Sequence, residues 1–222
     1  MKKQILSAAT ILLLSAVVFT TGCKKDDEDT TNPTVALNGS AVTYTQVNKA
    51  FSDPGATATD ETDGTLTANP SGTVNTSVVG TYIITYTATD AAGNKGTNTR
   101  TVYVVNFDGN YTLVQSGCTD VSANGTGTSV VSASGTTAAN RIDLGNFGLY
   151  AANTANATFS GTSITVATQA SATGVTGDKI EGTGSITGTG VGSDALKFVF
   201  QFTEKDASGT VFNTGTATFT HN

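Results

Sequence analysis

The sequence has no tryptophan and little of what builds helices. Its 222 residues include one histidine, one methionine and two cysteines, and only 13% are charged. Leucine, glutamate, lysine and methionine, which favour helices, are scarce, whereas threonine, serine, asparagine and the 25 glycines are abundant. So low a charge is not typical of a disordered chain. Threonine- and valine-rich runs broken by glycine and asparagine suit strands and tight turns, so the composition predicts an all-β protein.

The scarcity of histidine and cysteine also argues against catalysis. His221 is the penultimate residue, where a terminus usually frays, and no Ser-His-Asp or Cys-His pair can be assembled around it. Cys118 is interpreted as a buried filler rather than a nucleophile. The carboxylates that could serve a glycosidase are Asp178, Glu181, Asp194, Glu204 and Asp206. They lie in or beside predicted turns, where acidic residues are common, so we predict that the protein is not an enzyme.

The first segment has the layout of an export signal. Lys2 and Lys3 precede an uncharged run from Ile5 to Phe19, fifteen residues long. A helix that spans a bilayer needs roughly 20 apolar residues, so this run is short for a membrane anchor. A positive start, an apolar middle and small residues before a cleavage point are typical of a signal peptide, which we assign to residues 1–22.

The sequence Thr20-Thr21-Gly22-Cys23 resembles the lipobox of bacterial lipoproteins. The resemblance implies that Cys23 becomes the mature N-terminus and carries diacylglycerol and an N-linked acyl chain. Each buried methylene of such a lipid adds about 0.8 kcal/mol, so several chains form a durable anchor. The alternative is an ordinary signal peptide with an incidental cysteine. A lipidated Cys23 leaves Cys118 without a disulfide partner, and no other cofactor is expected.

A short charged run follows the cysteine, within a predicted acidic tether at residues 23–32. It resembles the surface-export signal of lipoproteins from the Bacteroidetes and consists of Lys24, Lys25, Asp26, Asp27 and Glu28. The resemblance implies an outer-membrane lipoprotein that faces the cell exterior. The alternative is a tether that is merely solvated and extended by its charges.

The charge balance excludes nucleic acid as a partner. Subtracting Lys2 and Lys3 from the 11 basic residues leaves nine, against 17 acidic residues. Binding to phosphates requires a basic face, which an acidic chain of this kind does not provide.

Residues 33–106 are predicted to form an Ig-like Greek-key sandwich of about seven short strands. The clearest strand alternates along 81–89, with Ile84 and Tyr86 facing the core and Tyr82 placed to bond backbone as a tyrosine corner. The segment resembles the bacterial surface Ig-like domain that also occurs in a pesticidal crystal toxin family. The matching motifs are Pro33 to Gly39, Asp53 to Asp60, Asp63-Gly64, Gly80-Thr81-Tyr82, Tyr86 and Asp90 to Asn94. The resemblance implies a spacer or adhesive module without catalytic residues.

Residues 107–222 are predicted to form further antiparallel strands, as a closed meander or a half-open barrel. The predicted strands are Tyr111 to Val114, Val130 to Ala133, Arg141 to Leu144, Ala157 to Phe159, Ser163 to Ala167, Lys179 to Ile186, Ala195 to Phe202 and Val211 to Thr220. The motifs at 144–148, 163–166 and 182–186 loosely resemble lipocalin-like barrel modules of Bacteroidetes lipoproteins.

Acidic residues near the turns of the first part could supply oxygen ligands for calcium. They are Asp53, Asp60, Glu61, Asp63 and Asp90. The segment 60–64 lacks the EF-hand spacing, and aspartate beside glycine is ordinary turn chemistry. No metal site is therefore assigned from the sequence, and calcium binding at these turns stays open.

The sequence as a whole indicates a surface lipoprotein whose spacer presents a second β-domain. The first hypothesis is adhesion or glycan capture, with Tyr150, Tyr111 and Phe147 as a platform for sugar rings. The absence of tryptophan counts against this platform, and aromatic residues in alternating strands are more often core. The second hypothesis is an accessory subunit of an outer-membrane complex. The third is a barrel that holds a small apolar ligand against Phe198 and Phe200.

Overall fold

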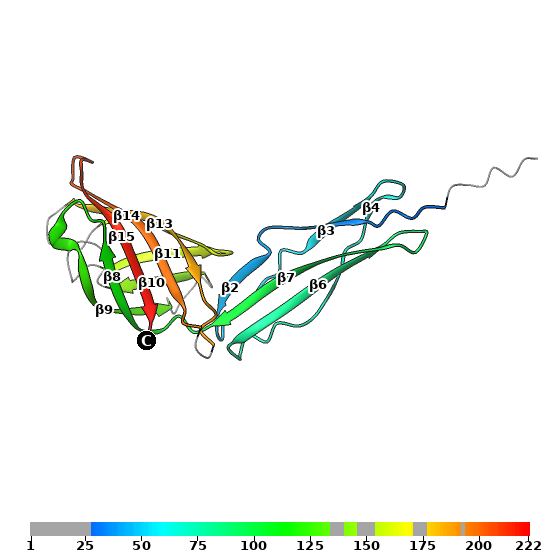
Figure 1. Ribbon diagram of the computed structural model, residues 1–222, viewed down its shortest axis with the longest axis horizontal. Helices are drawn as coiled ribbons and strands as arrows, with labels where there is room; N and C mark the ends of the chain where they lie inside the picture. Colours follow the sequence, from blue (N-terminus) through cyan, green and yellow to red (C-terminus); the bar gives the residue numbers. More distant parts are fainter. Residues whose placement is uncertain (1–27, 134–139, 146–153, 171–176, 192–193) are drawn as a thin grey trace, which may run out of the picture.

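The computed structural model describes residues 28–133, 140–145, 154–170, 177–191 and 194–222. These residues form two β-domains that follow one another along an elongated molecule (Figure 1). Among them, the one helical element is a single turn of 3₁₀-helix, η1 (Val121–Ala123). Within the same ranges there is no helix with the length and apolar character needed to cross a bilayer.

The first domain is a sandwich of two sheets. One sheet has the order β1-β3-β4 and the other has the order β2-β7-β6-β5. The strands are β1 (Thr34–Leu37), β2 (Val42–Gln46), β3 (Ala56–Asp60), β4 (Gly64–Leu66), β5 (Asn69–Ser71), β6 (Gly80–Thr89) and β7 (Lys95–Val105). The sheets enclose a core that includes Val35, Ala58, Ile84, Tyr86 and Val102. The predicted Ig-like sandwich is confirmed; its parallel pairing of β2 with β7 was not predicted.

Strands β6 and β7 form the long hairpin of this domain. As predicted, alternation places Ile84 and Tyr86 in the core. Tyr82 donates its hydroxyl to the carbonyl of Val78 at 2.9 Å, which confirms the predicted backbone bond, although its ring is only half-buried. Gly93 has a φ of 96° in the turn, a conformation that a residue without a Cβ adopts readily.

The second domain is a closed barrel of eight antiparallel strands. Around the barrel the order is β10-β11-β12-β13-β14-β15-β8-β9. The strands are β8 (Gly109–Ser116), β9 (Gly125–Ala133), β10 (Arg141–Gly145), β11 (Thr154–Ser160), β12 (Ser163–Ala170), β13 (Lys179–Thr187), β14 (Lys197–Lys205) and β15 (Val211–His221). Each strand predicted for this part is present, and the choice left open between an open and a closed form is settled by the pairing of β8 with both β9 and β15.

Aromatic rings fill the barrel interior around β14. Phe198 and Phe200 are fully buried, and the ring of Phe198 lies 5.3 Å from that of Tyr111 and 5.8 Å from that of Phe107. Two glycines on β13 make room for these rings, because Gly184 pairs with Phe200 and Gly182 pairs with Phe202. The hypothesis of a ligand cavity against Phe198 and Phe200 is therefore not supported, since neighbouring rings occupy that space.

The two domains meet without a linker and share one apolar cluster. Tyr44 of β2 belongs to the same cluster as Phe107 and the barrel core, and its hydroxyl donates to the carbonyl of Gly188 at 2.9 Å. Burial raises the pKa of Tyr44 to about 12, so this donor stays protonated at neutral pH. A Cβ on Gly161 would lie 2.7 Å from the Cβ of Ser40, which places the β11–β12 turn directly against the first domain. The first domain is thus joined to one rim of the barrel.

Candidate functional site

Most residues of the predicted lipid anchor and export signal lie outside the described part of the chain. These are Cys23, Lys24, Lys25, Asp26 and Asp27; Glu28, the first described residue, is exposed. Of the predicted glycan platform, Tyr150 and Phe147 also lie outside the described residues.

The prediction that Tyr111 belongs to a glycan platform is wrong. The ring of Tyr111 is completely buried, stacked 5.3 Å from that of Phe198 and in edge contact with the imidazole of His221 at 4.8 Å. Its hydroxyl donates to the carbonyl of Phe107 at 3.1 Å, and burial raises its pKa. Tyr111 and Leu113 lie on the inward face of β8, and alternation in the sequence alone did not tell which face of this strand points inward.

His221 does not fray as expected: it lies in β15, and its N–H donates to the carbonyl of Leu196 at 2.9 Å.

Of the carboxylates considered and set aside for a glycosidase, two lie within strands rather than in turns. Glu204 of β14 is fully buried and accepts a hydrogen bond from the side chain of Asn213 at 2.7 Å. The carboxylate of Glu181 on β13 accepts hydrogen bonds from Lys205 and Thr168. Both bonds lower the pKa of Glu181, and the bond from Lys205 has the larger effect. Cys118 is buried, as predicted, and burial raises the pKa of its thiol.

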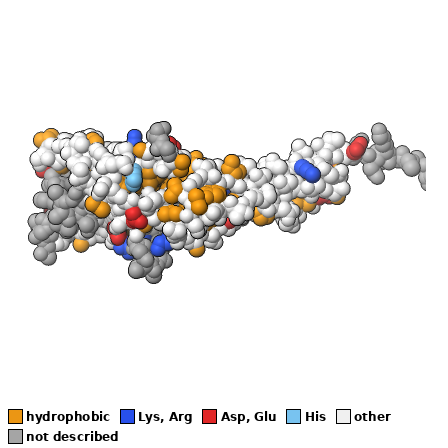
Figure 2. Space-filling view, turned by 90° about the horizontal axis from the view of Figure 1, so that it is seen from below, with side chains coloured by type: hydrophobic (Ala, Val, Ile, Leu, Met, Phe, Trp, Pro, Cys, Tyr) orange, Lys and Arg blue, Asp and Glu red, His pale blue; other side chains and the backbone are white. Residues whose placement is uncertain are grey.

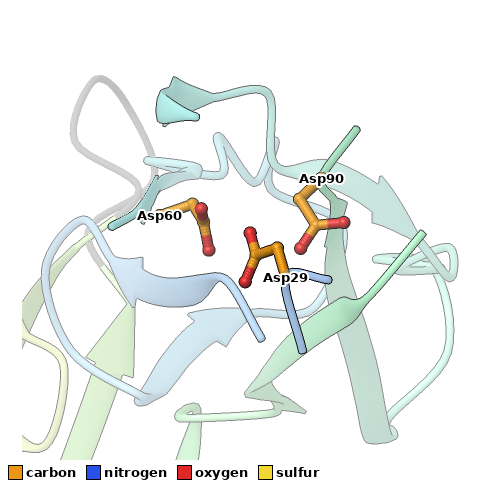
Figure 3. Close-up of side chains that lie close together, drawn as sticks. All are labelled: Asp29, Asp60 and Asp90. Carbon is orange, nitrogen blue, oxygen red and sulfur yellow. The ribbon is translucent and has the colours of Figure 1, made fainter. Parts of the chain in front are cut away.

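The acidic residues considered for calcium separate into distinct environments. Asp53 faces Arg100, with Nε 3.3 Å from Oδ1. Asp63 accepts the N–H of Ala91 at 2.7 Å, and Glu61 is exposed. Asp60 and Asp90 come together with a third acid, Asp29, which the sequence had assigned to the tether (Figure 3). We call the group Asp29, Asp60 and Asp90 the acidic tip.

The acidic tip joins three segments that are distant in the sequence. Asp60 ends β3, Asp90 follows β6, and Asp29 precedes β1. One carboxylate oxygen from each lies within 4.8 Å of the others, and Figure 3 shows the three side chains converging. Asp29 is held there because its carbonyl accepts the side-chain N–H of Asn94 at 2.9 Å. Sequence patterns could not find this residue, since it belongs to no strand or turn motif.

The hydrogen bonds of the acidic tip leave two oxygens without donors. Oδ1 of Asp60 accepts the N–H groups of Thr62 and Asp63 at 2.9 and 3.0 Å, whereas its Oδ2 is buried without a partner. Oδ1 of Asp29 accepts the N–H of Thr31 at 2.9 Å, and its Oδ2 is likewise buried without a partner. The bond from Thr31 is the main reason that the pKa of Asp29 is lowered, so this group is ionised at neutral pH.

Asp90 is bound differently. Its carboxylate accepts the backbone and side-chain N–H groups of Asn94 at 2.7 and 2.8 Å. Among the described residues, no basic side chain forms an ion pair with any member of the acidic tip. A buried carboxylate needs hydrogen bonds or a counter-charge, which makes the two orphaned oxygens the unusual feature of this site.

The barrel exterior carries a second candidate site, a shallow groove over β12, β13 and β14. The groove is lined by Thr165, Val166, Ala167, Thr168, Glu181, Gly182, Thr183, Gln201 and Thr203. The lining combines apolar surface with hydroxyl, amide and carboxylate groups, which can donate to or accept from a polyhydroxylated ligand. On the face that Figure 2 presents, charged side chains are few, and most of the surface is backbone and uncharged polar side chains.

Comparison with known proteins identifies the first domain. Residues 35–104 match the family described as bacterial surface protein, Ig-like domain. The resemblance predicted from the sequence is thereby confirmed. The lipoprotein BT2262 from Bacteroides thetaiotaomicron is a similar solved structure, with 18% identity and a TM-score of 0.32, covering 85% of this chain and 100% of that chain. No curated protein matches this chain.

Proposed function

We propose that the protein is a non-enzymatic lipoprotein of the outer cell surface, whose Ig-like domain holds a binding barrel away from the membrane. The observation that carries the proposal is the placement of the predicted anchor and the barrel. The segment that precedes β1 and carries Asp29, six residues after Cys23, lies at the end of the Ig-like domain opposite the barrel (Figure 1). A lipid on Cys23 would therefore extend the molecule from its membrane with the barrel outermost.

The barrel is the proposed binding element, and its outer surface is the proposed place of contact. Among the described residues, neighbouring rings pack against Phe198 and Phe200, and this favours the exterior or the rim as the place of contact. Gly145 and Thr154 pair at the rim away from the Ig-like domain, because β11 runs from Thr154 to the turn that contacts Ser40. The predicted platform residues Tyr150 and Phe147 fall between them in sequence. Glycans suit both this aromatic pair and the groove.

Binding of the chain from residue 24 onward to an array of polysaccharides and host glycans tests this proposal. We expect at least one glycan to bind, with binding lost either in Tyr150→Ala, if the rim is the site, or in Gln201→Ala, if the groove is. The matched control is Thr126→Ala, an exposed position on β9 outside the groove, which should bind as the wild type does. Binding that survives both site variants, or an array without any binding, would contradict glycan capture by this barrel.

A second function, docking onto an outer-membrane complex, is favoured by exposed apolar side chains on the Ig-like domain. Val78 and Ile83 expose 53% and 57% of their surface. The sheet edges β2 and β5 are also unpaired within this domain, whereas the closed barrel has no free edge. Co-purification of one membrane protein that is lost in Ile83→Ser, together with an array that shows no binding, would support docking instead of capture.

A further inference from the structure

We propose that the acidic tip binds one Ca²⁺ ion, which fastens the N-terminal segment to the end of the Ig-like domain opposite the barrel. Three carboxylates from three segments converge there, with one oxygen of each within 4.8 Å of the others. Acidic groups often cluster without a ligand, so the clustering alone would not suffice. The deciding feature is Asp60, which exposes only 9% of its surface and directs a buried oxygen without a donor into the cluster.

The existing hydrogen bonds indicate which kind of ligand the two buried oxygens would bind. The N–H donors of Thr31, Thr62 and Asp63 all bind the Oδ1 atoms of Asp29 and Asp60, and neither Oδ2 has a hydrogen-bond partner. The side chain of Thr62 is close enough to Asp29 to help lower its pKa, after the larger effect of the Thr31 N–H. The buried Oδ2 of Asp29 lacks a hydrogen-bond partner, as the buried Oδ2 of Asp60 does. A water molecule could donate to both oxygens, whereas a cation between them would bind both and also offset the repulsion of the three negative groups.

The donor set favours calcium over other metals. All three ligands are carboxylates, and no histidine or cysteine belongs to the group, which excludes the nitrogen and sulfur ligation that zinc prefers. Calcium accepts six to eight oxygens at irregular angles and completes its shell with carbonyls and water, whereas magnesium requires a near-ideal octahedron. Ligands fixed by three separate segments suit the more tolerant ion.

The ion would link the start of the domain to both of its sheets. Asp60 belongs to the sheet β1-β3-β4, Asp90 follows β6 of the other sheet, and Asp29 lies between the predicted tether and β1. A Cβ on Gly96 would lie 1.8 Å from the carbonyl oxygen of Pro33, so the segment that carries Asp29 already lies against β7. Bound calcium would stiffen the start of the spacer. This inference does not depend on the ligand of the barrel.

Isothermal titration calorimetry of the full chain in a mild detergent, after treatment with EDTA, tests the proposal. We expect one Ca²⁺ per chain with a Kd of about 0.1–1 mM, the range of extracellular calcium modules, and at least tenfold weaker binding of Mg²⁺. Asp29→Asn and Asp60→Asn should each weaken calcium binding at least tenfold. Both variants keep an Oδ1 acceptor for the backbone N–H groups, so they remove charge without removing the local turns.

Glu61→Gln is the matched control, because Glu61 is exposed next to Asp60 and outside the cluster; it should bind calcium as the wild type does. Thermal unfolding in about 10 mM CaCl₂ should shift upward by about 5 °C in the wild type and in Glu61→Gln, but not in Asp29→Asn. Because Asp29 precedes the first strand, its variant is expected to fold even if Asp60→Asn does not. Absence of calcium binding, equal binding of magnesium, or unchanged calcium affinity in Asp29→Asn would overturn the proposal.

Discussion

Arg100→Met is expected to lower the free energy of unfolding of the Ig-like domain by about 3–5 kcal/mol. The Arg100 side chain is only 1% exposed, and its Nε lies 3.3 Å from Oδ1 of Asp53. Its guanidinium also donates to the carbonyls of Asn38 and Gly55 at 2.8 and 3.0 Å and lies 6.0 Å from the ring centroid of Tyr86. Methionine replaces only the aliphatic part of arginine, so Asp53 loses its counter-charge and the carbonyl of Asn38 loses its donor. Asp53 keeps its bonds from Tyr86 and Gly55, and the carbonyl of Gly55 keeps the N–H of Asn38.

Chemical denaturation followed by circular dichroism measures this loss, and an exposed ion pair supplies the control. Arg141→Met breaks the pair with Asp143, whose side chains are 40% and 36% exposed, and should cost about 1 kcal/mol or less. The double variant Arg100→Met with Asp53→Leu should recover part of the loss, since it removes the stranded charge as well. Equal effects of Arg100→Met and Arg141→Met would show that Arg100 does not hold the Asp53 segment.

Gly184→Ala is expected to destabilise the barrel by about 3 kcal/mol, at the upper end for overpacking of a core. A Cβ on Gly184 would lie 2.0 Å from the carbonyl oxygen of Val199 and 2.9 Å from the Cα of Phe200. Both atoms belong to the backbone of β14, so relief requires a shift of the paired strand rather than of a flexible side chain. That shift would move Phe200, whose ring fills the barrel interior.

Gly125→Ala is the matched control for the barrel. Gly125 begins β9, has no neighbouring atom within 4 Å of a Cβ, and does not adopt a positive φ. The free energy of unfolding of this variant should therefore stay unchanged or rise by up to about 1 kcal/mol, because alanine restricts the unfolded chain. Thermal unfolding of both variants checks the pair of expectations. Comparable loss of stability in both would mean that Gly184 is not a packing requirement of the barrel.

Strand content was predictable because the signal is local. Alternation in 196–202 and 216–220 and turn residues at 206–209 are enough to place β14, β15 and their hairpin. Closure of the barrel was left open, because it depends on the pairing of β8 with both β9 and β15, and β15 lies about 100 residues farther along the chain. The packing of the interior also depends on strand pairing, because Gly184 of β13 lies opposite Phe200 of β14 only once the two strands are paired.

The candidate sites were predictable only in part. Turn chemistry drew attention to Asp60 and Asp90, but their convergence with Asp29 requires the folded sandwich to bring three segments to one end. Tyr111 was wrongly predicted to form part of an exposed platform. Tyrosine has an apolar ring and a polar tip and occurs on either face of a strand, so its residue type does not indicate which face it occupies. Arg100 carried no sequence signal at all: a single arginine within a threonine-rich strand is ordinarily exposed.

The central claim is that the barrel is displayed outside the cell by a lipid anchor at Cys23. An epitope inserted into the β14–β15 turn at Ala207 and Ser208, which are exposed at the rim away from the Ig-like domain, reports this most directly (Figure 1). The account predicts that an antibody labels intact cells, and that Cys23→Ala removes the label from the cell envelope. Labelling that appears only after the outer membrane is permeabilised would contradict surface display.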